Sequence, residues 1–202
     1  MTFDRDSLRQ SPLVVAPGLL GSILRVGGVA VRITEVEAYL GVGEDPGSHS
    51  FRGQTRRNAT MFGDAGHLYV YFTYGMHTCA NIVCSPPGTS GGVLIRAGEV
   101  IEGVDLARER RTTSKVDADL ARGPARLTVA LGIAMSDDGA DLESGRVRLD
   151  AAAPLPRASI SCGPRTGVSG LGGGEDYPWR FWITADPTVS PYKRATPRKP
   201  AG

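Results

Sequence analysis

The stretch VAVRITEVEAYL, Val29–Leu40, decides the fold because its side chains alternate in character as those of a β-strand do. Successive side chains of a strand point to opposite faces, so Glu35, Glu37 and Tyr39 share one face. The residues between them are apolar and occupy the other face. The two carboxylates therefore lie either in water or beside a cavity bounded by other parts of the chain, and the local pattern leaves both alternatives open.

The composition predicts one globular domain with a substantial core, since 41% of the 202 residues are hydrophobic and 22% are charged. We expect the domain to span residues 1–190 and the basic, proline-rich residues 191–202 to form a disordered tail. The net charge of +2 is too small to indicate a nucleic-acid binder by itself. There is no long apolar run, and the N-terminal MTFDRDSLRQ lacks the apolar core of a signal peptide. We therefore expect an intracellular protein that does not contact a membrane.

Metal and disulfide chemistry find little support in the sequence. The spacing of Cys79, Cys84 and Cys162 fits neither a zinc site nor a redox pair, which favours buried, reduced thiols. The three histidines have no clustered carboxylate, so we expect no metal ion.

A β-hairpin is predicted over His67–Ser85, where two runs of β-branched and aromatic residues meet. Tyr69 and Tyr71 share one face of the first strand. Tyr74 lies at the tip beside Gly75, where a large aromatic side chain is unusual. It either packs onto a neighbour or is available to enter a partner.

Several other segments indicate further elements. Gly91–Gly103 is a third predicted strand, and Arg96 within its apolar run requires an acid or a phosphate if it is buried. Arg122–Ile133 predicts a helix that begins at Gly-Pro, with Arg126 in a first turn whose free amides attract anions. Further predicted elements are a core segment at Leu13–Leu24 with a boundary at Pro17, a short helix at VDLARERR, and strands at RVRLDA, Ile160–Gly163 and WRFWITA.

Two long loops remain. Gly41–Gly66 contains His49 and several arginines, among them Arg57, which either hold phosphates or form a solvated surface. Gly163–Pro178 is rich in glycine but lacks the ending of a phosphate-binding loop, so we interpret it as a connection.

Four segments in this order resemble the alkyladenine (3-methyladenine) DNA glycosylase family, whose members excise damaged purines. They are ITEVEAYLG with the downstream His49, TRRN-x-x-MF at Thr55–Phe62, the hairpin LYVYFTYGMHTCANI, and VLIRA followed by GPARL. The resemblance implies an α+β fold: a single mixed domain with a curved antiparallel sheet, flanking helices and a protruding β-hairpin. It also implies a monomer that acts on double-stranded DNA containing damaged purines and needs no cofactor.

The resemblance also assigns roles to individual residues. Glu37 is implied to be the general base that activates a water, with Arg96 beside it. Tyr74 is implied to enter the duplex in place of the extruded nucleotide. The residues implied to surround the extruded base are Tyr39, His49, Tyr71 and Asn81, and those implied to contact the DNA are Arg57, Met76, His77 and Arg126.

Physical reasoning agrees with this assignment. A base inside a duplex must be flipped before a water and a carboxylate can reach its glycosidic bond. Glu35, about 7 Å along the strand from Glu37, is interpreted as structural, so neutral bases that need a proton on departure are expected to be poorer substrates. No lysine lies in these motifs, which predicts no Schiff base and no strand cleavage. The alternatives are a DNA-binding protein without catalysis and a nucleosidase for free nucleosides.

Overall fold

The computed structural model of the chain describes residues 4–73, 75 and 77–195. Within them the α-helices are α1 (Arg5–Leu8), α2 (Pro12–Gly18), α3 (Val104–Arg110) and α4 (Pro124–Leu131). The strands are β1 (Ile23–Val26), β2 (Val29–Tyr39), β3 (Leu68–Thr73), β4 (His77–Val83), β5 (Gly92–Glu102), β6 (Val147–Asp150), β7 (Ile160–Gly163) and β8 (Arg180–Ile183). Short 3-10 turns are η1 (Ala59–Phe62), η2 (Asp117–Asp119), η3 (Met135–Asp137), η4 (Arg157–Ser159) and η5 (Leu171–Gly173).

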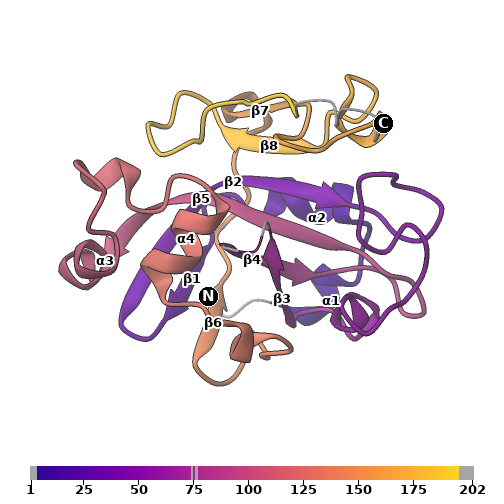
Figure 1. Cartoon of the computed structure of the whole chain (residues 1–202), viewed down its shortest axis with the longest axis horizontal. Coiled ribbons are helices and arrows are strands. Elements are labelled where there is room, and N and C mark those ends of the chain that lie inside the picture. The colour runs from indigo at the N-terminus through magenta and orange to yellow at the C-terminus, as the bar shows by residue number, and fades with distance from the viewer. Residues whose placement is uncertain (1–3, 74, 76, 196–202) are drawn as a thin grey trace.

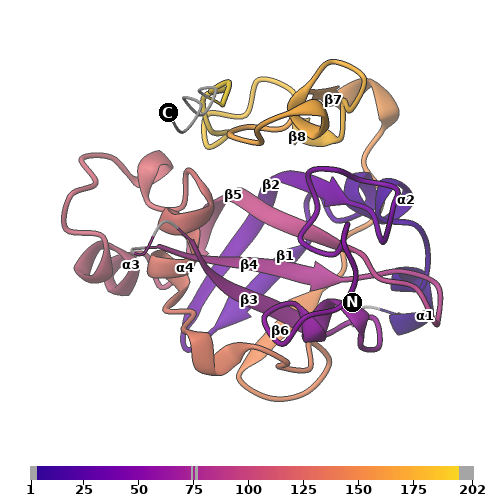
Figure 2. The same ribbon diagram turned by 45° about the vertical axis from the view of Figure 1, so that its right-hand side comes forward.

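The sheet is antiparallel throughout the described residues, and β2 is its central strand (Figures 1 and 2). Its strands follow the order β3-β4-β5-β2-β1-β6, and β8 also pairs with β2 and carries β7 on its other side. Residues 35–37 of β2 pair with β5 on one side and with β8 on the other. The expected strand at Val29–Leu40 is therefore confirmed, and its acidic part lies between two neighbours.

Opposite irregularities in β2 and β5 flank Glu35. Ile33 pairs with Gly98 and Glu35 with Ala97, which leaves Thr34 as an extra residue in β2. The next pair then skips Arg96, which becomes an extra residue in β5. Bulges of this kind redirect side chains and are frequent beside active sites.

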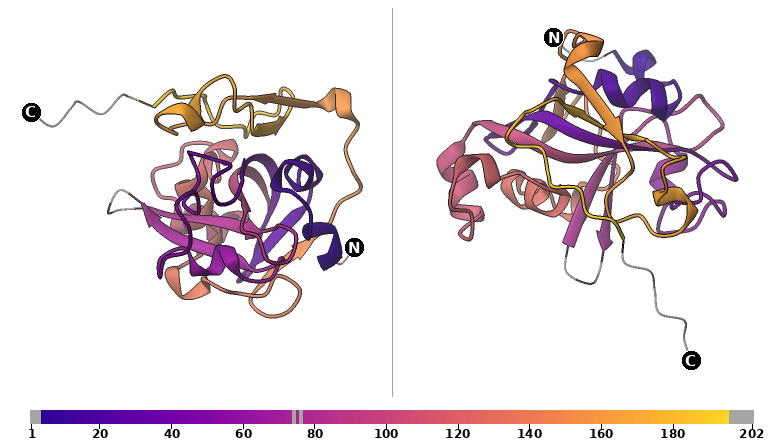
Figure 3. Two further views of the ribbon diagram at one scale, coloured as in Figure 1. Left: turned by 90° about the vertical axis from the view of Figure 1, so that its right-hand side faces the viewer. Right: turned by 90° about the horizontal axis from the view of Figure 1, so that it is seen from above.

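A second layer lies over β2 and β5. Residues 151–195, which we call the C-terminal layer, contain β7 and β8 and stack on one side of the remaining fold (Figures 1 and 3). The β3–β4 hairpin extends away from the body of the molecule (Figure 3). The single-domain α+β prediction is confirmed by this arrangement.

The main apolar core lies on the face of β2 opposite the acids. Val36 and Ala38 are fully buried in it, as the alternation of the sequence predicts. Helix α2 packs on β2, and α4 packs on β4, β5 and α3. Pro17 was expected to mark a boundary, but it lies inside α2, within the last turn of that short helix.

The cysteines are free thiols, and the expectation that all are buried is wrong for Cys162. Cys79 and Cys84 are buried in β4 and just after it, whereas Cys162 is exposed. The reason is that Cys162 lies in β7, which within the described part of the chain pairs with β8 alone and has an open face.

Candidate active site

A cavity of about 430 Å³ opens between the hairpin, the first turn of α4 and the C-terminal layer. Its size lies within the range of small-molecule sites, roughly 300–1,000 Å³. The polar and aromatic residues that line it are Glu37, Tyr39, His49, Tyr69, Tyr71, Thr73, His77, Cys79, Asn81, Arg96, Thr166 and Ser169. β2, β3, β4 and β5 thus each contribute side chains, together with two loops.

Glu37 is the only acidic residue among the described residues that line this cavity. Its side chain is fully buried, and its Oε1 accepts a hydrogen bond from the backbone N of Thr166 at 2.6 Å. Its Oε2 accepts from the Tyr39 hydroxyl at 2.8 Å and lies 3.3 Å from Nη1 of Arg96. The carboxylate is therefore held in one orientation by neighbours on both of its oxygens.

Arg96 connects the two buried carboxylates. Its Nε donates to Oε1 of Glu35 at 2.8 Å while its Nη1 faces Glu37. Burial opposes the charge of Arg96, but the Glu37 and Glu35 carboxylates raise the pKa of its guanidinium. The expectation that a buried Arg96 needs an acid is confirmed, and the acids are supplied by the adjacent strand.

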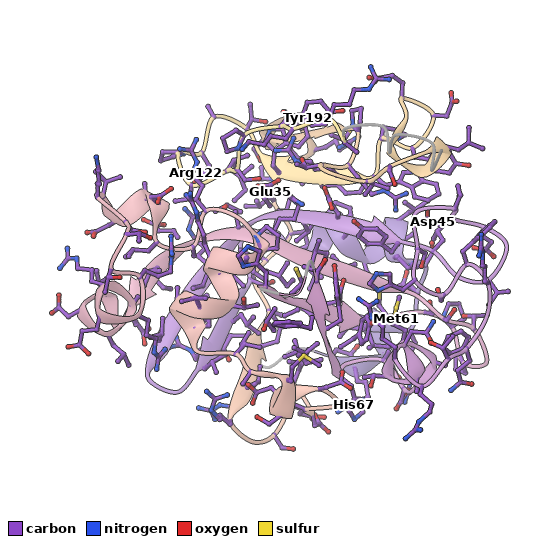
Figure 4. The ribbon with its side chains drawn as sticks, in the orientation of Figure 1. Glu35, Asp45, Met61, His67, Arg122 and Tyr192 are labelled. Carbon is purple, nitrogen blue, oxygen red and sulfur yellow. The ribbon has the colours of Figure 1, made fainter. Side chains whose placement is uncertain are left out.

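Glu35 faces the C-terminal layer and does not line the cavity (Figure 4). Its Oε1 also accepts from Nε of Arg180 at 2.6 Å and from the Ser190 hydroxyl at 2.9 Å. Its Oε2 accepts from the backbone N of Ser190 at 2.6 Å. These contacts attach the C-terminal layer to β2, which agrees with the structural role expected for Glu35.

The walls of the cavity are aromatic. The rings of Tyr69 and Tyr71 stack with centroids 5.4 Å apart, and the His49 ring meets Tyr71 edge-on at 4.6 Å. Burial raises the pKa of Tyr69 to about 12, and burial followed by the Cys79 thiol raises the pKa of Tyr71. Both phenols are therefore neutral at pH 7 and offer uncharged, electron-rich faces.

Two further polar side chains that line the cavity are those of His49 and Asn81. Partial burial of the ring, and then the positive charge of Arg57, lower the pKa of His49, which favours the neutral imidazole. Nδ1 of His49 lies 3.2 Å from the Tyr69 hydroxyl. Nδ2 of Asn81 donates to the backbone O of Tyr69 at 3.3 Å, so the amide is fixed against the hairpin strand.

The structure also brings in residues that the sequence reasoning missed. Tyr69 lines the cavity although only Tyr71 was predicted to do so. Gly163–Pro178 is not merely a connection, because its residues 166–169 form one wall. The alternation of Tyr69 with Tyr71 was a usable signal, whereas nothing local marked the loop.

A fully buried ion pair fixes that loop. Arg165 donates to both carboxylate oxygens of Asp45, at 2.6 and 2.7 Å, and to the backbone O of Gly172. Its Cζ lies 4.5 Å from the ring centroid of Tyr39. Arg165 thereby joins the loops after β2 and β7; Figure 4 labels Asp45.

The residues predicted to contact DNA are only partly brought together. His77 is exposed and lines the cavity, while Arg57 donates to the backbone O of Phe72 at 2.9 Å and so braces the hairpin. Arg126 pairs with Asp119 on the surface. Tyr74 and Met76 lie outside the described residues, and the DNA roles of all five residues stay predictions.

The part of the chain that the structure describes offers no group of three or more His, Cys, Asp or Glu side chains suited to a metal ion. Among the same residues there is no helix long and apolar enough to cross a membrane.

Comparison with curated proteins identifies the class of enzyme. Similar proteins occur in Leifsonia xyli subsp. xyli (56% identity over 198 residues, 94% of this chain and 92% of the relative) and Nocardia farcinica (54% over 201 residues, 96% and 93%). A protein of Streptomyces avermitilis is 52% identical over 202 residues, 96% of this chain and 93% of the relative. All three carry the name "Putative 3-methyladenine DNA glycosylase". The chain is thus a DNA glycosylase.

Residues 6–187 match the family described as "Methylpurine-DNA glycosylase (MPG)". This match covers most of the chain, and the chain belongs to that family. The resemblance noted from the four sequence segments is therefore confirmed.

Proposed function

We propose that this glycosylase flips an alkylated purine out of duplex DNA into the cavity and hydrolyses its N-glycosidic bond with a water activated by Glu37. The product is an abasic site, and no strand cleavage follows. The observation that carries the proposal is the Glu37 carboxylate, held beside Arg96 in an aromatic cavity. We further propose that the protein acts as a monomer inside the cell, where the damaged DNA lies.

The aromatic walls support recognition of a flipped purine. Stacking of a base on an aromatic side chain is worth roughly 1–3 kcal/mol. Tyr39, Tyr69 and Tyr71 provide such faces, and a purine that carries a positive charge after alkylation gains a cation–π attraction to them. This gain helps to offset the cost of unstacking, which is a few kcal/mol.

The proposed chemistry uses Glu37 as the base, and the substrate's own positive charge takes the place of a general acid. The water oxygen bonds to C1′ of the deoxyribose as the bond from C1′ to the purine nitrogen breaks, and its proton passes to Glu37. The electron pair of the broken bond neutralises the cationic purine, which leaves without protonation. No lysine is found among the described residues that line the cavity, which supports hydrolysis without a Schiff base.

Cationic purines are expected to be released at least about tenfold faster than hypoxanthine, because a missing general acid forfeits a contribution of 10²–10⁴ to the departure of a neutral base. Glu35 is not placed to supply that proton, since its side chain binds Arg96 and Arg180 and does not line the cavity. The measurement is single-turnover release from duplexes that each carry one 7-methylguanine, 3-methyladenine, hypoxanthine or ethenoadenine.

The same experiment tests the proposed function as a whole. Abasic sites should accumulate only in the modified duplexes, and free modified nucleosides should be hydrolysed far more slowly. Comparable rates on free nucleosides would favour a nucleosidase. Equal single-turnover rates for hypoxanthine and 7-methylguanine would contradict the proposal that the site has no general acid for the leaving base.

The Tyr74→Ser variant is expected to lose excision in duplexes by about tenfold or more, and much less in single strands. The reason is that a side chain inserted into the stack offsets lost base stacking only where a stack exists. Single-turnover rates on the same lesion in both forms measure the difference. Val14→Ser, an exposed change in α2 and away from the hairpin, is the control, and equal losses in duplex and single strand would exclude the wedge.

A further inference from the structure

Two buried side-chain hydroxyls among the described residues have no hydrogen-bond partner, those of Thr166 and Ser90. An unpartnered hydroxyl in the interior loses its hydrogen bonds to water without replacement, so each instance requires an explanation. Ser90 lines a separate hollow between the start of α2 and the loops after β2 and β4. Thr166 lines the active-site cavity.

The bonding of Glu37 shows where a water can bind. A carboxylate oxygen accepts about two hydrogen bonds. Oε2 already receives the Tyr39 hydroxyl and faces Arg96 at 3.3 Å. Among the described residues Oε1 receives only the backbone N of Thr166, so the acceptor site that remains is on the oxygen beside Thr166.

Thr166 is held firmly at this place. Its neighbour Arg165 is fixed by the buried pair with Asp45, and on the other side the N of Gly167 donates to the backbone O of Lys193 at 2.9 Å. The hydroxyl is attached through Cα and Cβ to the nitrogen that contacts Oε1. A water bound to the open site of Oε1 is therefore within reach of that hydroxyl.

We infer that the Thr166 hydroxyl is a catalytic group that holds the attacking water together with Glu37. This inference rests on the proposed function. The water gives one hydrogen to Oε1 of Glu37 and its other hydrogen bonds to Oγ1 of Thr166, so that a lone pair of its oxygen faces C1′. As the new C–O bond forms, the bond to the purine breaks with its electron pair going to the base, and the first proton moves to Glu37.

Thr166→Val is expected to slow single-turnover release of 7-methylguanine by about tenfold or more, while the Kd for the damaged duplex stays within about twofold. Valine has nearly the shape of threonine and keeps the backbone N that binds Glu37, so only the hydroxyl is lost. Removing an unpartnered buried hydroxyl should leave the Tm unchanged or raise it. Lower activity together with equal or higher stability distinguishes this role from a structural one.

Two further variants serve as controls. Thr166→Ser retains the hydroxyl and should stay within about threefold of the wild-type rate. Ser90→Ala removes the other unpartnered hydroxyl, so it should affect the Tm in the same direction and leave the rate unchanged.

The outcomes separate this inference from the proposed function. A wild-type rate in Thr166→Val, equal slowing in the valine and serine variants, or weaker binding at an unchanged rate overturns the role of the hydroxyl. If the wild-type protein itself releases no modified purine, the proposed function fails instead.

Discussion

Glu37→Gln is expected to bind a duplex containing a damaged purine but to release the base at least about 100-fold more slowly than the wild type. A general base contributes 10²–10⁴ to a reaction of this kind, and glutamine cannot take the proton of the water. The amide also lacks the negative charge that stabilises a developing positive charge at C1′. Single-turnover release, with the Kd measured on the same duplex, gives both quantities.

The contacts around Glu37 predict that this variant still folds. The amide oxygen can accept from the backbone N of Thr166, and the Tyr39 hydroxyl can rotate to accept from the amide NH₂. Arg96 keeps its partner Glu35. Thermal unfolding should therefore confirm a folded protein, and release within about tenfold of the wild-type rate would remove Glu37 from its role.

The sequence was sufficient to predict the central strand and to tell which of its two faces lies in the apolar core. Alternation placed Glu35, Glu37 and Tyr39 together, and the apolar residues between them are indeed in the core. The rule that a buried arginine needs an acid anticipated the partners of Arg96. The first of these predictions succeeded because it rests on a local repeat in the sequence. The second succeeded because an unpaired buried charge is unfavourable in any fold.

The environment of that strand could not be predicted in the same way. Arg165 meets Asp45 across 120 residues, and Thr166 meets Glu37 across 129. Such contacts depend on how the C-terminal layer docks, and a glycine-rich loop has no periodicity that reveals a buried face. The bulge at Arg96 is likewise a property of the pairing of β5 with β2, not of either strand alone.

Glu35→Ala is expected to lower the free energy of unfolding by about 3–5 kcal/mol, the range for removing one partner of a buried ion pair. The glutamate is fully buried, and the side chains of Arg96 and Arg180 that it binds are only 8% and 5% exposed. Without it, two guanidinium groups lose their shared acceptor, and Ser190 loses the acceptor of its backbone N. Because domains of this kind are stabilised by only about 5–15 kcal/mol, the loss is a large fraction of the total.

Urea denaturation of Glu35→Ala beside Glu99→Ala measures this effect against a matched control. Glu99 pairs with Arg32 across the same two strands, but its side chain is 48% exposed, so its loss should cost no more than about 1 kcal/mol. Equal losses in the two variants would contradict a special role for Glu35. A larger loss in Glu35→Ala, with faster proteolysis within residues 151–195, is expected, because its contacts to Arg180 and Ser190 attach that layer to the strand that carries Glu37. The two acids of one strand face thus have separate roles: Glu35 fixes the layer that supplies Thr166, and in the proposed mechanism Glu37 acts on the water beside Thr166.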